Sequence, residues 1–349
     1  MLLITIAMFK QINAALHRSR FNVLLCLSMS MVCPLVLAQM PSPQALLDRL
    51  DINQQDISRI NQGEIVLFDV DSRSETELTA GIIIYILGSP SQISALIKKD
   101  GLASLDPQTI SGELIPLRAS LSVFENFNFT KESTEETDFL SATASDQFNL
   151  STEELKLISS QTTKLPDKAA DIYRQILWQR WQSYRRYGLK GIAPYDRGHS
   201  TLINPGVALQ SAALEHDLAT DYFPELFNAW YHFPNTVIPA GVEESYAWVN
   251  RLVQDRPTAI LTHRFIVSEA QGELILARQF YAGHSFNANQ LALICLPYKK
   301  GALIFYTNRN FTDQVSGMGS TVKHFIGEKL ARTHVIDLLT ALQNHFKPN

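Results

Sequence analysis

Residues 247–346 constrain the fold more than any other part of the chain. Segments rich in β-branched, aromatic and aliphatic residues predict five strands, at 245–253, 258–268, 273–285, 290–296 and 302–309. Turn-forming residues separate them, for example at 255–257 and 287–289. One long helix is expected after the last strand. The economical interpretation is an antiparallel meander closed by a C-terminal helix.

The longest of these strands is apolar on both faces. Within 273–286, period two places Leu276 and Phe280 on one face with Arg278, His284 and Phe286, and Ile275, Ala277, Gln279 and Tyr281 on the other. Both faces should therefore be covered. The helix predicted at 316–345 has apolar residues near helical spacing and is expected to cover one face. A long helix across a curved sheet would enclose a cavity, although a helix that completes an ordinary core gives the same pattern.

The N-terminal half predicts further elements of the same sheet. A helix is expected at 44–59, and a second at 91–99 with Ser89 as its cap and Pro90 in its first turn. Strands are predicted at 63–70, 77–87, 110–115 and 119–125.

Residues 126–244 have a different composition and read as a helical insertion. Residues 131–146 are polar and predict an exposed loop, and Ser151 with Glu154 predicts a capping box. Helices are expected at 167–187, 204–218 and 222–231. The helix at 167–187 carries arginines that could face an anionic lipid or a partner, or simply solvent: Arg174, Arg180, Arg185 and Arg186.

The first 38 residues predict an export signal. They contain no Asp or Glu, carry Lys10, Arg18 and Arg20, and end in an apolar run at 21–38 with Ala38 before Gln39. The expected location is periplasmic, with a signal peptide at 1–38. A retained N-terminal membrane anchor is the alternative, because the run approaches spanning length. The pattern leaves open whether translation starts at Met1 or Met8.

Charge and cysteine content exclude several classes. The formal charge is −4, and removal of three positive residues with 1–38 makes it −7, so nucleic acid is not an expected partner. Cys26 and Cys33 lie in the export segment, which leaves Cys295 alone and allows no disulfide within the mature chain. No phosphate-binding loop, dinucleotide motif, Cys-x-x-Cys or zinc spacing is present. We therefore predict neither a cofactor nor a metal.

The order of these elements, two strands, a helix, further strands and a closing helix, resembles that of the START-like, or helix-grip (SRPBCC-type), superfamily. The resemblance implies an α+β fold in which a curved antiparallel sheet wraps a long C-terminal helix around an apolar cavity. It implies a single domain at 39–349, with the helical insertion at about 126–244.

A more specific set of residues is similar to a family of exported bacterial proteins that has no established activity. The similarity covers about 167–330 and rests on 184–188, 222–226, Tyr246, Trp248, 262–263, 279–286 and 308–309. This chain lacks the cysteine-bearing block that the family has before its central helices. The resemblance supports the fold and implies no chemistry.

Polar and aromatic residues on the predicted strands are the candidates for a ligand site. Two histidines and a tyrosine on neighbouring strands could orient a polar ligand group or act as acid and base, or they could be hydrogen-bonded members of the sheet. An arginine at the end of the last strand could clamp a carboxylate or phosphate, or form a structural salt bridge. The predicted ligand-binding residues are Trp248, His263, Gln279, Tyr281, His284, Phe286, Asn308 and Arg309.

The leading hypothesis is an exported, non-catalytic START-like protein that binds a lipid or another hydrophobic small molecule. One alternative is an enzyme of the cyclase or hydrolase kind that uses His263, Tyr281 and His284. Another is a non-catalytic envelope protein in which the insertion contacts the membrane or other envelope proteins. The Tyr195–Ser200 segment contains catalytic residue types, but neighbours in sequence diverge on a loop, and a turn is predicted there.

Overall fold

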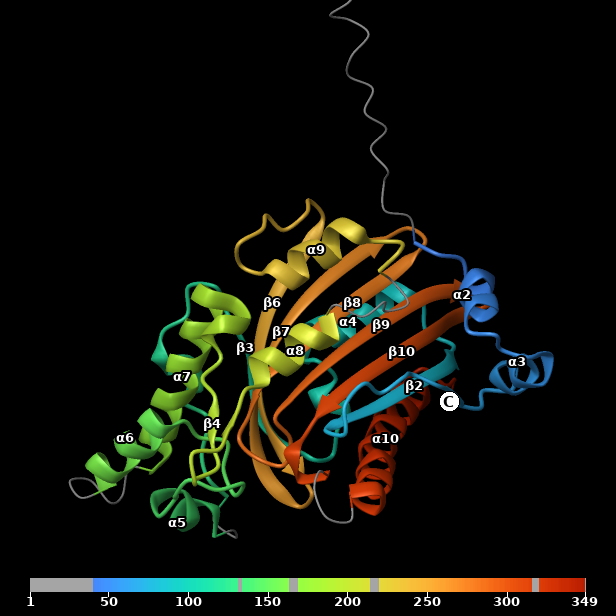
Figure 1. Cartoon of the computed structure of the whole chain (residues 1–349). Helices are drawn as coiled ribbons and strands as arrows, with labels where there is room; N and C mark the ends of the chain where they lie inside the picture. The colour runs from blue at the N-terminus through green and yellow to red at the C-terminus, as the bar shows by residue number, and fades with distance from the viewer. Residues whose placement is uncertain (1–39, 131–133, 163–168, 214–219, 316–319, 349) are drawn as a thin grey trace, which may run out of the picture. The chain divides into compact units, whose positions relative to one another are not determined.

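The fold is α+β and is built on one large antiparallel sheet, as predicted (Figure 1). The computed structural model describes residues 40–130, 134–162, 169–213, 220–315 and 320–348. These residues belong to one compact unit, Met40–Asn349. The signal peptide expected at 1–38 lies outside the described residues.

The sheet has eight strands in the order β1-β2-β10-β9-β8-β7-β6-β3. The five C-terminal strands were predicted correctly, and each neighbouring pair is antiparallel. The N-terminal strands β2 and β3 extend this meander on its two sides, because β2 pairs with β10 and β3 with β6. The bounds are β1 Val66–Phe68, β2 Glu77–Ile86, β3 Thr109–Ile115, β6 Val242–Val253, β7 Arg256–Glu269, β8 Gly272–Ala282, β9 Ala288–Tyr298 and β10 Gly301–Phe311.

Side-chain caps determine where the N-terminal helices begin. The helix expected at 44–59 is two helices, α2 (Pro43–Arg49) and α3 (Gln54–Asn61), because Asn53 caps α3 by accepting a hydrogen bond from the Asp56 amide. Helix α4 (Pro90–Asp100) begins with the predicted Ser89 cap, which forms a capping box with Gln92.

The prediction of a strand at 119–125 was wrong. These residues form a short 3-10 helix, η2 (Leu121–Phe124), which directs Phe124 against the Trp248 ring. The insertion therefore follows the third strand rather than the fourth.

The insertion between β3 and β6 contains the expected helices and one that was missed. The loop predicted at 131–146 holds α5 (Glu135–Leu140), which is anchored by buried Phe139 and by an ion pair between Glu135 and Arg256. The Ser151–Glu154 capping box is present. The turn predicted at 195–200 starts later than expected, because its first two residues form the two-residue strand β4 (Tyr195–Asp196), which pairs with β5 (Leu202–Ile203). The other helices are α6 Thr152–Thr162, α7 Ala169–Tyr187, α8 Pro205–Ala213 and α9 Pro224–His232.

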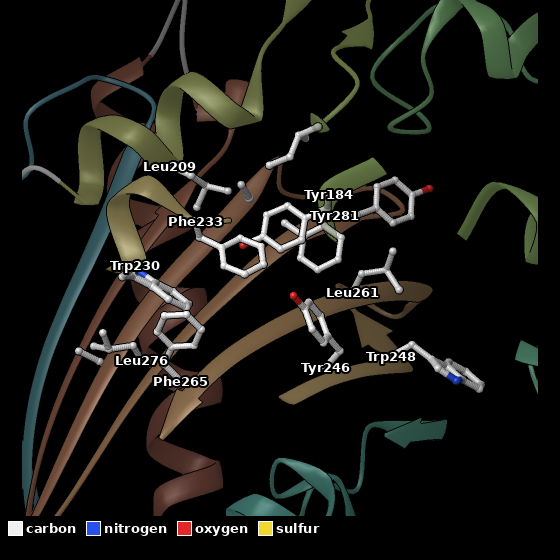
Figure 2. Close-up of a cluster of buried hydrophobic side chains, with 14 of the residues drawn as sticks. Tyr184, Leu209, Trp230, Phe233, Tyr246, Trp248, Leu261, Phe265, Leu276 and Tyr281 are labelled. Carbon is white, nitrogen blue, oxygen red and sulfur yellow. The ribbon is translucent and has the colours of Figure 1, made fainter. Parts of the chain in front are cut away.

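Both faces of the sheet are covered, as the apolar pattern predicted. The face that bears Leu274 and Leu276, called the α7 face here, packs on side chains of α7, α8 and α9 (Figure 2). The opposite face, which bears Ile275 and Ile304 and is called the α10 face, packs on α4 and on α10 (Ser320–His345). Figure 1 shows α10 running along that side of the sheet. Helix α10 contributes Val335, Leu339 and Leu342 to the core.

A bulge in β8 changes which residues share a face. Leu261 of β7 pairs with Tyr281, and the next residue, Thr262, pairs with Gln279, so Phe280 has no partner. Phe280 stacks on Tyr184 and Tyr281 contacts Tyr173, so both lie on the α7 face. Strict alternation placed Gln279 and Tyr281 on one face, and the bulge separates them.

Candidate functional site

A cavity of about 500 Å³ lies between the α10 face of the sheet and the helices that cover it. Strands β6 to β10 form its floor, with apolar side chains that include Leu291 and Leu293. Ile97 of α4 and Val335 and Leu338 of α10 contribute to its opposite wall. The volume is within the usual range for small-molecule sites.

Carboxamide side chains form a polar strip on the cavity floor. Gln279 on β8 pairs with Asn289 on β9, and Asn289 pairs with Asn310 on β10. Asn308 is two residues along β10 from Asn310, so its side chain points to the same face. All four side chains line the cavity, and Asn289 and Asn308 are buried.

Two arginines reach the cavity from β6 and β7. Arg251 donates a hydrogen bond to His334 Nε2 of α10 at 2.9 Å. Arg264 donates to the carbonyl oxygen of Ile97 at 2.7 Å. Burial lowers the pKa of both guanidinium groups and of the His334 imidazole.

Three of the eight residues predicted from the sequence line this cavity: Gln279, Phe286 and Asn308. Arg309 is the neighbour of Asn308 on β10 and points to the other side of the strand. It forms an ion pair with Glu77 at 2.6 Å, which is the salt-bridge alternative considered for it. Trp248, His263, Tyr281 and His284 are buried elsewhere.

His263 belongs to a closed polar network on the α7 face. Arg278 donates to the Tyr184 hydroxyl, which is 2.9 Å from His263 Nδ1, and His263 Nε2 is 3.2 Å from Glu244. The Tyr246 ring stacks on the imidazole. The side chain has no exposed surface, and burial lowers the pKa of His263 to about 4. This network holds α7 to β7 and β8.

The other three residues also have structural partners. His284 lies 2.9 Å from the carbonyl oxygen of Pro257 and 2.7 Å from the Ser285 hydroxyl, and burial lowers its pKa to about 3. The Tyr281 hydroxyl lies 3.1 Å from that of Tyr173. Trp248 donates to the carbonyl oxygen of Val123.

Sequence reasoning missed Asn289, Asn310, Arg251 and Arg264. Asn289 was assigned to a turn because asparagine is common there, whereas β9 begins at Ala288. Asn310 lies one residue beyond the predicted end of its strand. The signal that could have found them is the period of two along the strands. Asn308 and Asn310 are two residues apart on β10 and so share a face, and Asn289 of β9 pairs with Asn310.

The arginines of α7 fasten the insertion to its surroundings. Arg180 is buried rather than solvated and pairs with Glu154 at 2.5 Å. Arg174 donates to the carbonyl oxygen of Phe127, and Arg185 to that of Leu117. The cationic side expected on this helix is therefore reduced mainly to Arg186, which is exposed.

Other chemical features are sparse in the described part of the chain. Burial raises the pKa of the Cys295 thiol, which lies on β9 in the core of the α10 face. Among the described residues, no three His, Cys, Asp or Glu side chains gather to hold a metal ion. No helix in the ranges described combines the length and apolar character needed to span a membrane.

Comparisons with protein-family models, with curated proteins and with solved structures found no significant match to this chain. The assignment to a family stays a prediction, and the proposals below rest on the geometry of the chain itself.

Proposed function

We propose that the sheet and α10 form a START-like helix-grip. The order β2, α4, β3, then β6 to β10 and α10, supports this proposal. The sheet order supports it too, because β2 and β3 are consecutive in the chain apart from α4 and a 3-10 turn, yet lie on opposite sides of the meander. On this proposal β1 is an additional edge strand, and the helical insertion lies between the neighbouring strands β3 and β6.

We further propose that the protein binds a lipid or another hydrophobic small molecule between the sheet and α10. The observation that carries the proposal is the cavity of about 500 Å³ with many apolar lining residues. Transfer of apolar ligand surface from water into such a cavity would drive binding, at about 25 cal/mol per Å².

Binding is favoured over the catalytic alternative. His263, Tyr281 and His284 contact other protein groups away from the cavity, and each is at most 1% exposed. A general acid or base must reach its substrate within hydrogen-bond distance. An enzyme acting in this cavity would need other residues.

The direct test is native mass spectrometry of the protein purified from its own source, followed by extraction and identification of any copurified molecule. We expect one apolar molecule per chain. A protein that carries none, and that binds no member of a panel of apolar probes after delipidation, would contradict the proposal.

A second test fills the cavity. Ala277 lies on the floor between Arg264 and Leu291, so Ala277→Phe should reduce the affinity for an apolar probe at least about tenfold, with a stability loss of about 1 to 3 kcal/mol from overpacking. Val237 is 87% exposed, and Val237→Phe is the matched control that should bind normally. Equal affinity in both variants, measured by isothermal titration calorimetry, would place the ligand elsewhere.

A further inference from the structure

The four carboxamides of the cavity floor are incompletely hydrogen-bonded. The side-chain oxygens of Gln279, Asn289, Asn308 and Asn310 are inaccessible to water and find no hydrogen-bond partner among the described residues. A buried polar group that lacks a partner usually costs about 1 to 3 kcal/mol, so native proteins seldom retain several together. Four on one wall of one cavity indicate that something else satisfies them.

Carboxamides specify the partner by their hydrogen-bonding capacity. Each amide offers two N–H donors and one carbonyl acceptor. An ionised carboxylate or phosphate has acceptors only and leaves the amide oxygens without donors, whereas an ammonium group has donors only and leaves the amide N–H groups without acceptors. Hydroxyl and amide groups offer both a donor and an acceptor, so they match the carboxamides of the strip, including buried Asn289 and Asn308. An exchange of oxygen and nitrogen within an amide changes which of the two atoms faces the cavity, but each carboxamide still presents one acceptor and one N–H₂ donor group.

The charge of the lining also disfavours an anion. The described residues around the cavity include four aspartates, Asp100, Asp106, Asp255 and Asp337, but only two arginines, a formal charge of −2 with His334 neutral. Each arginine already donates a hydrogen bond to a protein group. The Nε and Nη2 groups of Arg264 have no partner among the described residues, and a hydroxyl or carbonyl oxygen of a neutral ligand can accept from them. Asp106 lies 3.7 Å from His334, which accepts the bond from Arg251. The negative charge of the lining would therefore repel an anionic head group.

We infer that the ligand is a neutral molecule, largely hydrocarbon, whose hydroxyl or amide groups hydrogen-bond to the Gln279, Asn289, Asn308 and Asn310 strip. This inference rests on the proposed binding function and names the chemical class of its ligand. Acyl glycerols and long-chain alcohols or amides belong to this class. Free fatty acids and phosphate-bearing lipids do not.

The test compares three probes with the same acyl or alkyl chain. 1-Monolauroylglycerol is neutral with two hydroxyl groups, laurate is anionic and dodecylamine is cationic. Isothermal titration calorimetry on the delipidated protein should give at least tenfold tighter binding for 1-monolauroylglycerol than for either charged probe. If laurate or dodecylamine binds as tightly or more tightly, the inference is overturned while the proposed binding function stands. If none of the three binds, the inference is overturned, and the proposed binding function is overturned as well only if no apolar molecule copurifies with the protein.

A near-isosteric substitution isolates the amide strip. Asn308→Leu keeps the side-chain shape and removes its hydrogen bonds, so it should weaken 1-monolauroylglycerol on the order of tenfold and leave laurate affinity within about twofold. Asn228→Leu on the exposed side of α9 is the matched control and should bind like the wild type. Gln279→Met, at a half-buried position of the same strip, provides the same test if Asn308→Leu does not fold. Unchanged selectivity in the folded variants would overturn the inference.

Discussion

Arg180→Met is expected to destabilise the protein by about 3 to 5 kcal/mol, as loss of one partner of a buried ion pair does. Arg180 and Glu154 are 5% and 9% exposed, and the guanidinium also lies 4.3 Å from the centre of the Tyr281 ring. Without the arginine, the Glu154 carboxylate still accepts the hydrogen bond from the Ser151 backbone amide but loses the neighbouring positive charge. The change should appear as a lower urea midpoint with an unchanged slope.

A second substitution tests whether the unpaired Glu154 carboxylate causes the loss of stability. Arg180→Met combined with Glu154→Leu should regain part of the lost stability, because it removes the unpaired charge. Arg186→Met replaces an exposed arginine of the same helix and should change stability by less than about 0.5 kcal/mol. A loss below about 1 kcal/mol for Arg180→Met would show that solvent reaches this pair and that it does not fix α6 to α7.

The buried role of Arg180 illustrates what a helical pattern cannot predict. The apolar residues of α7 recur at helical spacing and are buried: Ile172, Ile176, Leu177, Trp181 and Tyr184. Arg180 is next to Trp181 and is buried because α6 places Glu154 against it. That pairing depends on how two helices cross, which neither helix encodes by itself. The helical pattern treated the arginines of α7 as one group that faces a lipid, a partner or solvent.

The strands were predictable for a physical reason. Strands β6 to β10 combine β-branched and aromatic residues with short turns, so pattern and turn chemistry agree. Their apolar character on both sides correctly required two covering layers. Residue composition did not distinguish a cavity from a packed core, because the same Leu and Ile side chains line either. The cavity depends on the spacing between the sheet and α10.

The candidate site was only partly predictable, and for Tyr281 the reason is a one-residue bulge in β8. Period two is reliable along β8 as far as Gln279, and the bulge at Phe280 then moves Tyr281 to the α7 face. The sequence gives no mark of this bulge. The prediction therefore combined residues of two faces, and Gln279 and Asn308 share the cavity while His263 and Tyr281 lie beneath α7.

The stability of the protein is expected to fall as the pH drops from about 6.5 toward 4. The pKa of His263 is lowered to about 4 and that of His284 to about 3, from an ordinary value of 6.5. Between these values the unfolded chain binds protons that the folded chain does not, so acid favours unfolding. For His263 the difference corresponds to about 3 kcal/mol. Glu244 and Asp313, whose pKa values are lowered by hydrogen bonds that outweigh burial, add to the loss at lower pH.

Replacing His263 with glutamine distinguishes the contribution of the imidazole to the pH dependence of stability from that of these carboxylates. His263→Gln removes the titrating ring from beside Arg278, so its free energy of unfolding should depend less on pH than that of the wild type. The wild type should be more stable near pH 7, and its advantage should shrink by about 3 kcal/mol by pH 4. His199→Asn changes an exposed histidine whose positive φ suits asparagine, and its curve should run parallel to that of the wild type. Parallel curves for His263→Gln and the wild type in urea unfolding across this range would mean that His263 accepts a proton within the fold. The closed network of Arg278, Tyr184 and Glu244 would then have to open in acid.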